Sequence, residues 1–174
     1  TVEIEPERVA TENVDQRVYL LESRDRLNVL KRILAMPEAT SVIVFANRRD
    51  VVRKVHERLQ KQGLECGILS GEIAQVKRTK TLERFKSGKL RVLIATDVAG
   101  RGIHVDGVSH VVNYDLPEDP EDYVHRIGRT GRAGEKGVSI SFASEDDAFL
   151  LPEIEALLGK SLKCIQVPEA LLAD

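Results

Sequence analysis

The sequence predicts an α/β fold, a domain of three layers in which helices cover both faces of a mainly parallel sheet. Short apolar runs alternate along the chain with segments whose apolar residues recur at helical spacing, and the connections between them are short. Strands joined through helices in this way form right-handed crossovers, which make neighbouring strands parallel. The 174 residues, of which 42% are hydrophobic and 31% charged, suit one globular domain with a sizeable core.

The first half of the chain supplies three strand–helix pairs. Residues 42–45 read Val-Ile-Val-Phe, a continuous apolar run typical of a strand buried on both faces. Leucine and isoleucine recur at helical spacing after Ser23, a residue that favours helix starts. The predicted order is a strand at 18–21, a helix after Ser23, a strand at 42–45, a helix at 51–59 that ends at Gly63, a strand at 66–69 and a helix at 76–85.

The second half continues the alternation. The predicted order is strands at 92–95 and 108–114, a helix at 121–129, a strand at 138–142, a helix at 146–158 and an edge strand at 162–167. Unusual loops follow four strands, at 46–49, 70–72, 96–104 and 113–117. Ligands of such sheets bind beyond the carboxyl ends of the strands, so these loops are predicted to form the site. Residues 1–14 are predicted to be a linker, which leaves 15–174 as the domain.

Composition restricts the function. The formal net charge is −2, so a nucleic-acid site would have to be a local basic patch. No apolar run approaches the roughly 18 residues that span a bilayer, and the acidic start lacks a signal-peptide pattern, so we expect a cytoplasmic protein without a membrane partner. Cys66 and Cys164 are far apart and lack metal-type spacing, so we expect both to be reduced and buried, with no metal site.

The run from His125 to Arg132 carries the strongest chemical signal. Arginines stand at 126, 129 and 132, with glycines at 128, 131 and 134. A helical start would place the three arginines along one side, within an arc of about 120°. Arginine forks suit phosphates, and the glycines permit close approach to a ligand or another surface. A solvated arginine face is the alternative, but it would not require this glycine and histidine spacing.

The run His-Arg-Ile-Gly-Arg-Thr-Gly-Arg resembles motif VI of DEAD-box RNA helicases over all eight residues. The resemblance covers roughly residues 18–155. Residues 42–47 resemble motif IV, Gln75 and Arg78 fit the following QxxR element, residues 95–102 resemble motif V, and 112–117 the strand and turn after it. This resemblance implies the C-terminal RecA-like domain, a three-layer α/β/α fold, of a two-lobed ATP-dependent RNA helicase.

The resemblance implies that the absent N-terminal lobe is a partner and holds most of the ATP and Mg²⁺ contacts. Neither a G-x-x-x-x-G-K-[ST] phosphate loop nor an Asp-Glu-Ala-Asp motif occurs here, so we expect the chain alone not to hydrolyse ATP. Arg129 and Arg132 are implied to be arginine fingers on the γ-phosphate, and His125 to bridge to the other lobe. Gly102 and His104 are implied to contact the nucleotide.

The family's RNA contacts fall on four residues, Asn47, Gly71, Arg78 and Thr96, which would bind the sugar–phosphate backbone rather than bases. The alternative for Thr96 is a strand-end hydroxyl bonded to local backbone, and for Arg78 a helix-surface charge. Arg126 is implied to be structural and to tie its helix to the loop of Asp97. The family usually has Asp where His104 stands, which puts the ribose contact in doubt and adds a group that can be charged near neutral pH.

Residues 101–104 (Arg-Gly-Ile-His) and 114–119 (Tyr-Asp-Leu-Pro-Glu-Asp) are most similar to the bacterial RhlB branch of the family. Helicases of that branch partner the endoribonuclease RNase E, so the chain is a candidate for RNA degradation with a docking surface, for which an exposed apolar patch would be the physical signal. Two alternatives are a docking module without catalysis and a translocase on DNA. The fingers argue against the first, and the His-Arg-Ile-Gly form argues against the second.

Overall fold

The computed structural model describes residues 11–71, 73–100, 105–131 and 134–172. The strands are β1 (Val14–Leu20), β2 (Val42–Phe45), β3 (Gly67–Leu69), β4 (Val92–Ala95), β5 (His110–Asn113), β6 (Gly137–Ala143) and β7 (Cys164–Gln166). The α-helices are α2 (Arg26–Leu34), α3 (Arg49–Lys61), α4 (Gln75–Lys86), α5 (Asp97–Gly100), α6 (Pro120–Ile127), α7 (Leu151–Leu158) and α8 (Glu169–Leu172). Two 3₁₀ turns, η1 (Ser23–Asp25) and η2 (Ala148–Leu150), precede α2 and α7.

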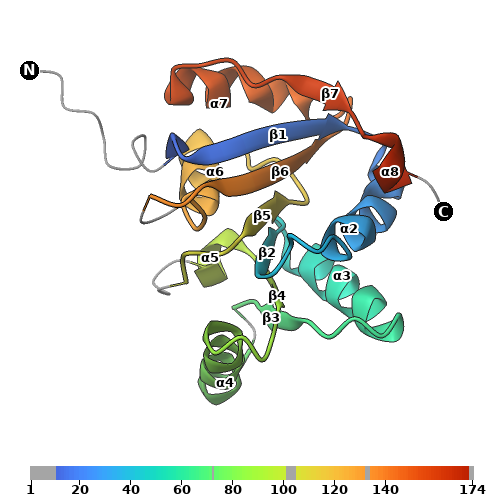
Figure 1. Ribbon diagram of the computed structural model, residues 1–174, viewed down its shortest axis with the longest axis vertical. Coiled ribbons are helices and arrows are strands. Elements are labelled where there is room, and N and C mark those ends of the chain that lie inside the picture. Colours follow the sequence, from blue (N-terminus) through green and yellow to red (C-terminus); the bar gives the residue numbers. More distant parts are fainter. Residues whose placement is uncertain (1–10, 72, 101–104, 132–133, 173–174) are drawn as a thin grey trace, which may run out of the picture.

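The seven strands form one sheet in the order β3-β4-β2-β5-β6-β1-β7 (Figure 1). Every pair of named strands is parallel, which confirms the predicted sheet and its edge strand β7. Because all strands run the same way, the loops after β2, β3, β4 and β5 lie at one edge of the sheet. The turn after α6 lies at the opposite, amino edge.

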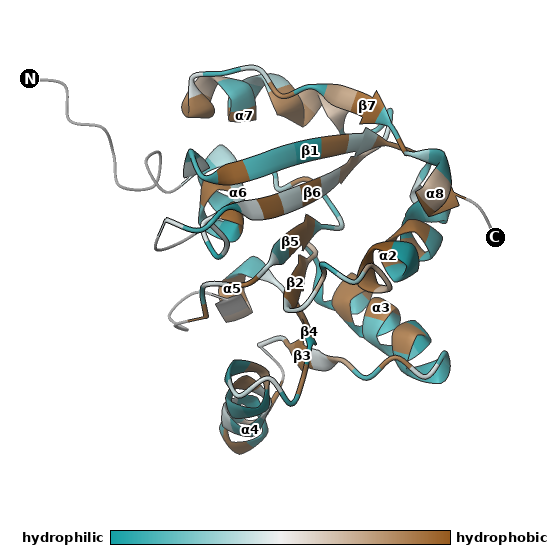
Figure 2. Ribbon diagram, viewed as in Figure 1, coloured by the Kyte–Doolittle hydropathy of each residue, from teal (hydrophilic) through white to brown (hydrophobic). Residues whose placement is uncertain are grey.

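Alternate side chains of each central strand enter different cores, as expected for a sheet covered on both faces. Val42 and Val44 of β2 pack in the core formed with α2 and α3, whereas Ile43 and Phe45 pack in the core formed with α4 and α5. A third cluster joins β1 to α6 and α7. Figure 2 shows brown along β2 and both colours on the helices, as expected for an apolar central strand and amphipathic helices.

Several predicted boundaries moved. Residue Ser23 opens η1 rather than capping α2, and no side-chain cap bond is present at either start. The predicted helix at 121–129 ends at Ile127, and the one at 146–158 is η2 followed by α7. β1 begins at Val14, the last residue of the predicted linker. Among the described residues, no helix combines the length and the apolar character needed to cross a membrane.

Candidate functional site

The centre of the site is the side chain of Arg126, which is only 1% exposed. Its Nε and Nη2 donate to the two carboxylate oxygens of Asp97, each at 2.6 Å. Its remaining N–H groups donate to Asn47 Oδ1 at 2.6 Å, to the Asp115 carbonyl at 2.8 Å and to Asn113 Oδ1 at 3.3 Å. All five donors of the guanidinium are therefore used, as a buried cation requires.

These partners come from segments far apart in the sequence. Asp97 begins α5 after β4, and Asn47 follows β2. Asn113 is the last residue of β5, and Asp115 lies in the loop after it. The loops after β2, β4 and β5 are therefore held together by one side chain from α6. The structure shows the predicted link between Arg126 and Asp97 and adds Asn47 and Asn113, whose contacts with Arg126 were not predicted.

Local sequence explains why α6 presents Arg126 to these loops. The Asp119 side chain caps the helix by accepting from the Glu121 N–H at 3.0 Å, and Pro120 stands in the first turn. Tyr123 and Ile127 bury the face that packs on β1 and α7. Helical side chains point back toward the helix start, so Arg126 reaches the carboxyl edge of the sheet although it lies in the last turn.

The prediction that the three arginines share one side of a helix is wrong. The helix ends at Ile127, and Arg129 follows in a turn. Arg129 is partly buried, and its carbonyl accepts from the Val108 N–H at 3.1 Å, just before β5 begins. The Arg126 side chain therefore reaches the carboxyl edge of the sheet, whereas the backbone of Arg129 lies at the amino edge, next to the start of β5. Arg132 lies outside the described residues.

The glycine of this turn is required by the chain itself. Gly131 has φ +70°, a left-handed conformation that favours glycine, and an added Cβ would lie 3.0 Å from the Asn13 carbonyl oxygen. The close approach predicted for these glycines thus occurs, at Gly131, against the segment that leads into β1. Thr130 is fully buried beside it and donates to the Val108 carbonyl. These contacts fix the turn that carries Arg129.

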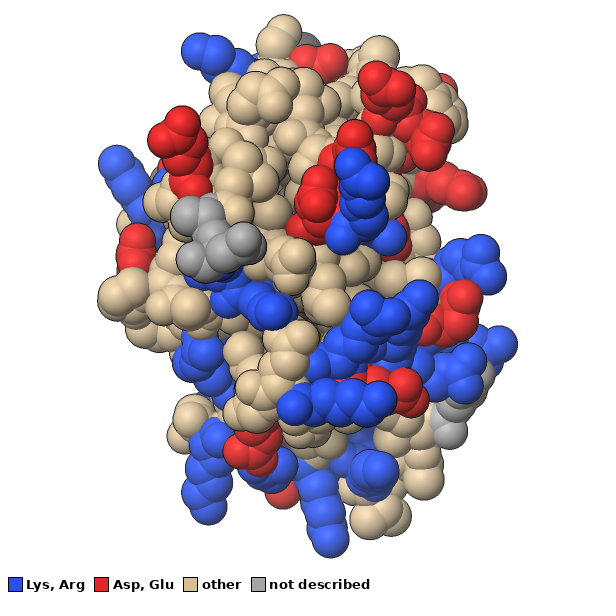
Figure 3. Space-filling view, turned by 90° about the vertical axis from the view of Figure 1, so that its right-hand side faces the viewer, with Lys and Arg blue, Asp and Glu red and all other residues tan. Residues whose placement is uncertain are grey.

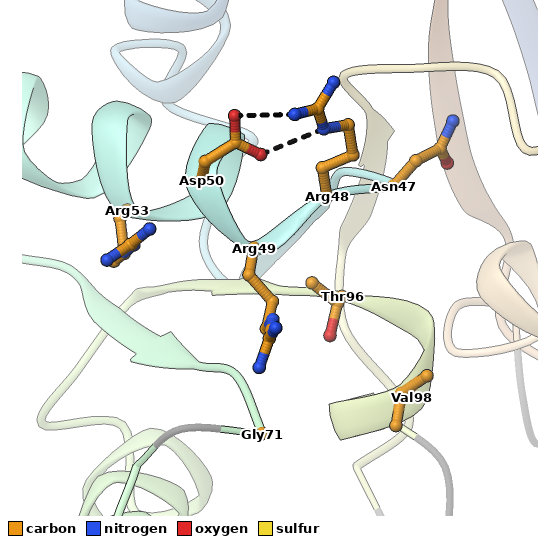
Figure 4. Close-up of a pocket in the computed structure, with 8 residues that line it drawn as sticks. All are labelled: Asn47, Arg48, Arg49, Asp50, Arg53, Gly71, Thr96 and Val98. Carbon is orange, nitrogen blue, oxygen red and sulfur yellow. Dashed lines mark hydrogen bonds and ion pairs between the residues drawn. The ribbon is translucent and has the colours of Figure 1, made fainter.

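A hollow of about 560 Å³ lies at the carboxyl edge. We call it the first hollow, and its lining residues are Asn47, Arg48, Arg49, Asp50, Arg53, Gly71, Thr96 and Val98 (Figure 4). Three of the four predicted RNA-contact residues line it, and they come from loops after β2, β3 and β4. Figure 4 shows Arg49 reaching from α3 toward Gly71, with Thr96 facing the same space. Sequence reasoning missed Arg49 and Arg53, although their spacing of one helical turn was a usable signal.

Thr96 and Gly71 meet the hollow differently. Thr96 is 5% exposed, and its Oγ1 accepts from the Ala99 N–H at 3.3 Å, which is the local backbone role considered from the sequence. That bond uses the oxygen as acceptor, and the hydroxyl can still donate to a ligand. A Cβ added to Gly71 would meet nothing within 4 Å, so protein packing does not require glycine there.

Arg78 is held near the first hollow but does not line it. Its Nη2 donates to the Ala99 carbonyl at 2.5 Å, which joins α4 to α5. It is therefore more than a helix-surface charge. Asn47 is also committed, because its side-chain nitrogen donates to the Leu116 carbonyl at 3.0 Å and its oxygen accepts from Arg126.

The near-zero net charge conceals two oppositely charged regions. Residues 48–91 hold 13 Lys and Arg against 5 Asp and Glu, whereas residues 115–174 hold 6 against 13. On the face of the molecule that carries α2 and α3, Lys and Arg gather over the lower half and Asp and Glu over the upper half (Figure 3). The first hollow belongs to the basic region, as expected for an anion site.

Other predicted site residues stand apart from the first hollow. His125 is exposed on α6, and Gly102 and His104 lie outside the described residues. Among the described residues, no group of three or more His, Cys, Asp or Glu is arranged to hold a metal ion. Cys66 is buried, and burial raises the pKa of its thiol to about 11, but Cys164 is only partly buried, contrary to prediction.

Comparison with known proteins gives a family and close relatives. The helicase conserved C-terminal domain family matches residues 25–134. An ATP-dependent RNA helicase RhlB of Pseudomonas aeruginosa (strain UCBPP-PA14) is 58% identical over 171 residues, which cover 98% of this chain and 43% of the relative. That of Shewanella frigidimarina (strain NCIMB 400) is 44% identical over 173 residues, 99% of this chain and 40% of the relative. The chain thus spans less than half the length of these relatives.

Solved structures give the same fold. The Escherichia coli DEAD-box protein SrmB, bound to regulator of ribonuclease activity A, is 37% identical with a TM-score of 0.81, over 89% of this chain and 91% of that one. Saccharomyces cerevisiae Dbp5, bound to RNA and ADP BeF₃, is 34% identical with a TM-score of 0.83, over 97% of this chain and 45% of that one.

Proposed function

The chain belongs to the helicase conserved C-terminal domain family, as a RecA-like domain of the DEAD-box type similar to those of RhlB helicases, and from this premise we propose that it is the C-terminal half of an ATP-dependent RNA helicase. Its two tasks in that enzyme are to bind the RNA backbone and to supply arginine fingers for ATP hydrolysis. The observation that carries the proposal is the convergence of Gly71, Thr96 and Arg49 on one basic hollow.

In this proposal, RNA phosphates lie in the first hollow. The Thr96 hydroxyl and the Arg49 and Arg53 guanidinium groups line it and can donate to phosphate oxygens. Gly71 leaves room for the backbone of the strand to approach. These groups contact phosphate and sugar rather than base edges, so binding should tolerate any sequence. Dbp5, a structural relative, was solved with RNA bound.

The nucleotide half of the proposal concerns the turn after α6. ATP, held with Mg²⁺ mainly by the N-terminal lobe, would transfer its γ-phosphoryl group to water and leave ADP, and this hydrolysis would drive unwinding. Arg129 and Arg132 would neutralise the charge that develops on that group. Such arginine fingers raise the rate of phosphoryl transfer by a factor on the order of 10³–10⁵. The bonds of Thr130 and the packing of Gly131 support a preorganised turn at Arg129. His125, exposed beside it, would contact the other lobe.

Arg126 would couple the two halves. Its side chain holds Asn47 and Asp97 at the edge that carries the first hollow, while its own helix leads directly into the Arg129 turn. A shift of α6 on nucleotide binding would therefore move groups next to the RNA. We assign Arg126 a positioning role, because its five donors are all occupied within the chain.

The decisive experiment joins this chain to its N-terminal lobe and measures RNA-dependent ATP hydrolysis. Arg129→Ala should lower kcat by at least about 10³-fold with little effect on RNA affinity. Arg49→Gln with Arg53→Gln should instead weaken RNA binding and raise the RNA concentration needed for half-maximal activity. Lys160→Gln, in the acidic region and outside the hollow, is the control. Unchanged ATP hydrolysis by Arg129→Ala would remove the finger assignment.

His104 is proposed to weaken the nucleotide contact, because it replaces the aspartate usual in the family. In the two-lobe protein, His104→Asp should tighten ATP binding and reduce its pH dependence between about 6 and 7, where histidine titrates. Unchanged ATP affinity and RNA-stimulated turnover would contradict this role.

The alternative role, docking on a ribonuclease such as RNase E, is favoured by one separate feature. A hollow of about 550 Å³ in the acidic region carries Phe149, whose side chain is 73% exposed, beside Glu118 and Asp146. An exposed aromatic side chain with an acidic rim suits a basic segment with an apolar anchor. SrmB is a structural relative solved with a protein partner.

Capture of this chain by an RNase E scaffold segment tests the docking role. Phe149→Ser should abolish capture at micromolar concentration, whereas Leu172→Ser, at an apolar side chain that is 53% exposed elsewhere, should not. Absence of capture of the unchanged chain would count against this partner.

A further inference from the structure

A second hollow, of about 300 Å³, lies between the start of α2 and α3. We call it the α2–α3 hollow. Its lining residues are Ser23, Arg24, Arg26, Leu27, Asp50, Val51, Lys54, Val55, Arg58 and Tyr114. Among the described residues of the sequence motifs, Tyr114 alone lines it, and neither proposed task of the domain uses this hollow.

The rim of this hollow is strongly basic. Four cations line it against one carboxylate, Asp50, which already accepts from Arg48 at 3.1 Å. One of the four, Arg24, is paired with Glu22 at 2.7 Å. Lys54 and Arg58 are exposed, stand one helical turn apart on α3 and form no ion pair with any residue that the structure describes. Both side chains therefore line the hollow without a carboxylate partner of their own.

The wall opposite α3 is rigid. The Arg26 guanidinium lies 4.3 Å from the centre of the Tyr114 ring, donates to the Tyr114 carbonyl at 3.1 Å and forms an ion pair with Asp115. Tyr114 is 7% exposed and Val55 3%, so the floor belongs to the packed core. The hollow therefore exists before any ligand binds, which lowers the entropic cost of binding.

The α2–α3 hollow lies next to the first hollow. Asp50, in the first turn of α3, lines both of them. The helix directs Arg49 and Arg53 to the first hollow and Lys54 and Arg58 to the second, along two stripes about 140° apart. A polyanion lying in the first hollow can therefore reach the second across the start of α3, where the Asp50 carboxylate that lies between them is paired with Arg48.

We propose that the α2–α3 hollow binds phosphates of the RNA strand beyond those in the first hollow. This inference rests on the proposed function, since it assumes that RNA occupies the first hollow. The shared wall favours RNA over an acidic protein segment, because RNA carries regular charge from one hollow into the next. Lys54 and Arg58 contact these additional phosphates, so they raise the affinity only for RNA that is long enough to reach the α2–α3 hollow.

Binding of single-stranded RNA to the complete two-lobe protein tests the proposal. Affinity is measured over a range of salt for a short oligonucleotide that fills only the first hollow and for a longer one. Lys54→Gln with Arg58→Gln should leave the short RNA unaffected. For the long RNA, the double substitution should make the slope of log affinity against log salt concentration less steep by about 1.4. This corresponds to an affinity about 25-fold weaker at 0.1 M salt.

Two further variants separate the possible failures. Lys61→Gln, on the same helix but lining neither hollow, should change neither affinity. Arg49→Gln with Arg53→Gln should weaken both RNAs, and if it weakens neither, the proposed function fails. If that variant acts but Lys54→Gln with Arg58→Gln leaves the long RNA unchanged, the second subsite is refuted. Loss of polyglutamate binding with RNA binding intact would assign the hollow to an acidic protein instead.

Discussion

Replacing Arg126 by methionine should destabilise the domain severely while keeping most of the side-chain volume. The substitution removes all five hydrogen bonds of the guanidinium. Asp97, whose side chain is 18% exposed, would keep its charge without a cation. The oxygen of Asn113, a residue with no exposed surface, would lose its donor.

The magnitude follows from these two losses. Removing one partner of a buried ion pair costs about 3–5 kcal/mol, and the partial exposure of Asp97 favours the lower end. The orphaned Asn113 oxygen adds about 1 kcal/mol. The sum, about 4 kcal/mol, is a large part of the roughly 5–15 kcal/mol that stabilises a typical domain. For a domain of this size it corresponds to a Tm lowered by about 8–16 °C.

Urea unfolding followed by circular dichroism is the appropriate assay, since the chain has no tryptophan. Arg126→Lys should fall between wild type and Arg126→Met, because lysine has three donors and no planar fork. The double variant Arg126→Met with Asp97→Asn should cost less than the sum of the single variants, because no unpaired charge remains. A loss below about 1 kcal/mol for Arg126→Met, or strict additivity, would refute the reasoning.

Three further predictions concern glycines and a thiol. Gly131→Ala should lower the free energy of unfolding, measured in urea, by at least about 2 kcal/mol. Gly63→Ala should lower it by about 1 kcal/mol, because Gly63 has φ +81° but an added Cβ there would meet nothing within 4 Å. Equal losses would contradict the packing role. Gly71→Val should leave the urea midpoint unchanged and weaken RNA binding by at least about tenfold, and unchanged affinity would move RNA away from the first hollow. Burial raises the pKa of Cys66 from 9.0 to about 11, so the unfolded thiol loses its proton first. Stability should therefore fall as the pH rises from 9 to 11, by up to about 1.4 kcal/mol per pH unit, and Cys66→Ala should flatten that decline.

The order of strands and helices could be read from the sequence because local patterns determine it. The continuous apolar runs at 42–45 and 92–95 became central strands with the same bounds. A side chain buried on either face of a strand must be apolar wherever the rest of the chain goes. Boundaries moved at the ends of elements, as at Ser23, which opens a 3₁₀ turn before α2.

The positions of the site loops were also predictable. Parallel strands bring their carboxyl ends to one edge, so loops after neighbouring strands meet there whatever their composition. Asn47, Gly71 and Thr96 line one hollow for this reason. The contributions of Arg49 and Arg53 were not predicted, because a helix shows from sequence which residues share a face but not what that face meets.

The motif that begins at His125 shows what the sequence determined and what only the fold decided. The sequence alone determined that arginines and glycines alternate here at a spacing suited to phosphate chemistry. Their spacing predicted Arg126 and Arg129 on one helical side, and only the family resemblance assigned Arg126 a structural role and Arg129 a finger role. The tertiary structure separated them, because α6 ends at Ile127 and Gly131 turns the chain against the segment before β1. Arg126 is buried and fully bonded because loops after three different strands converge on it, and no local pattern encodes contacts between residues so far apart along the chain.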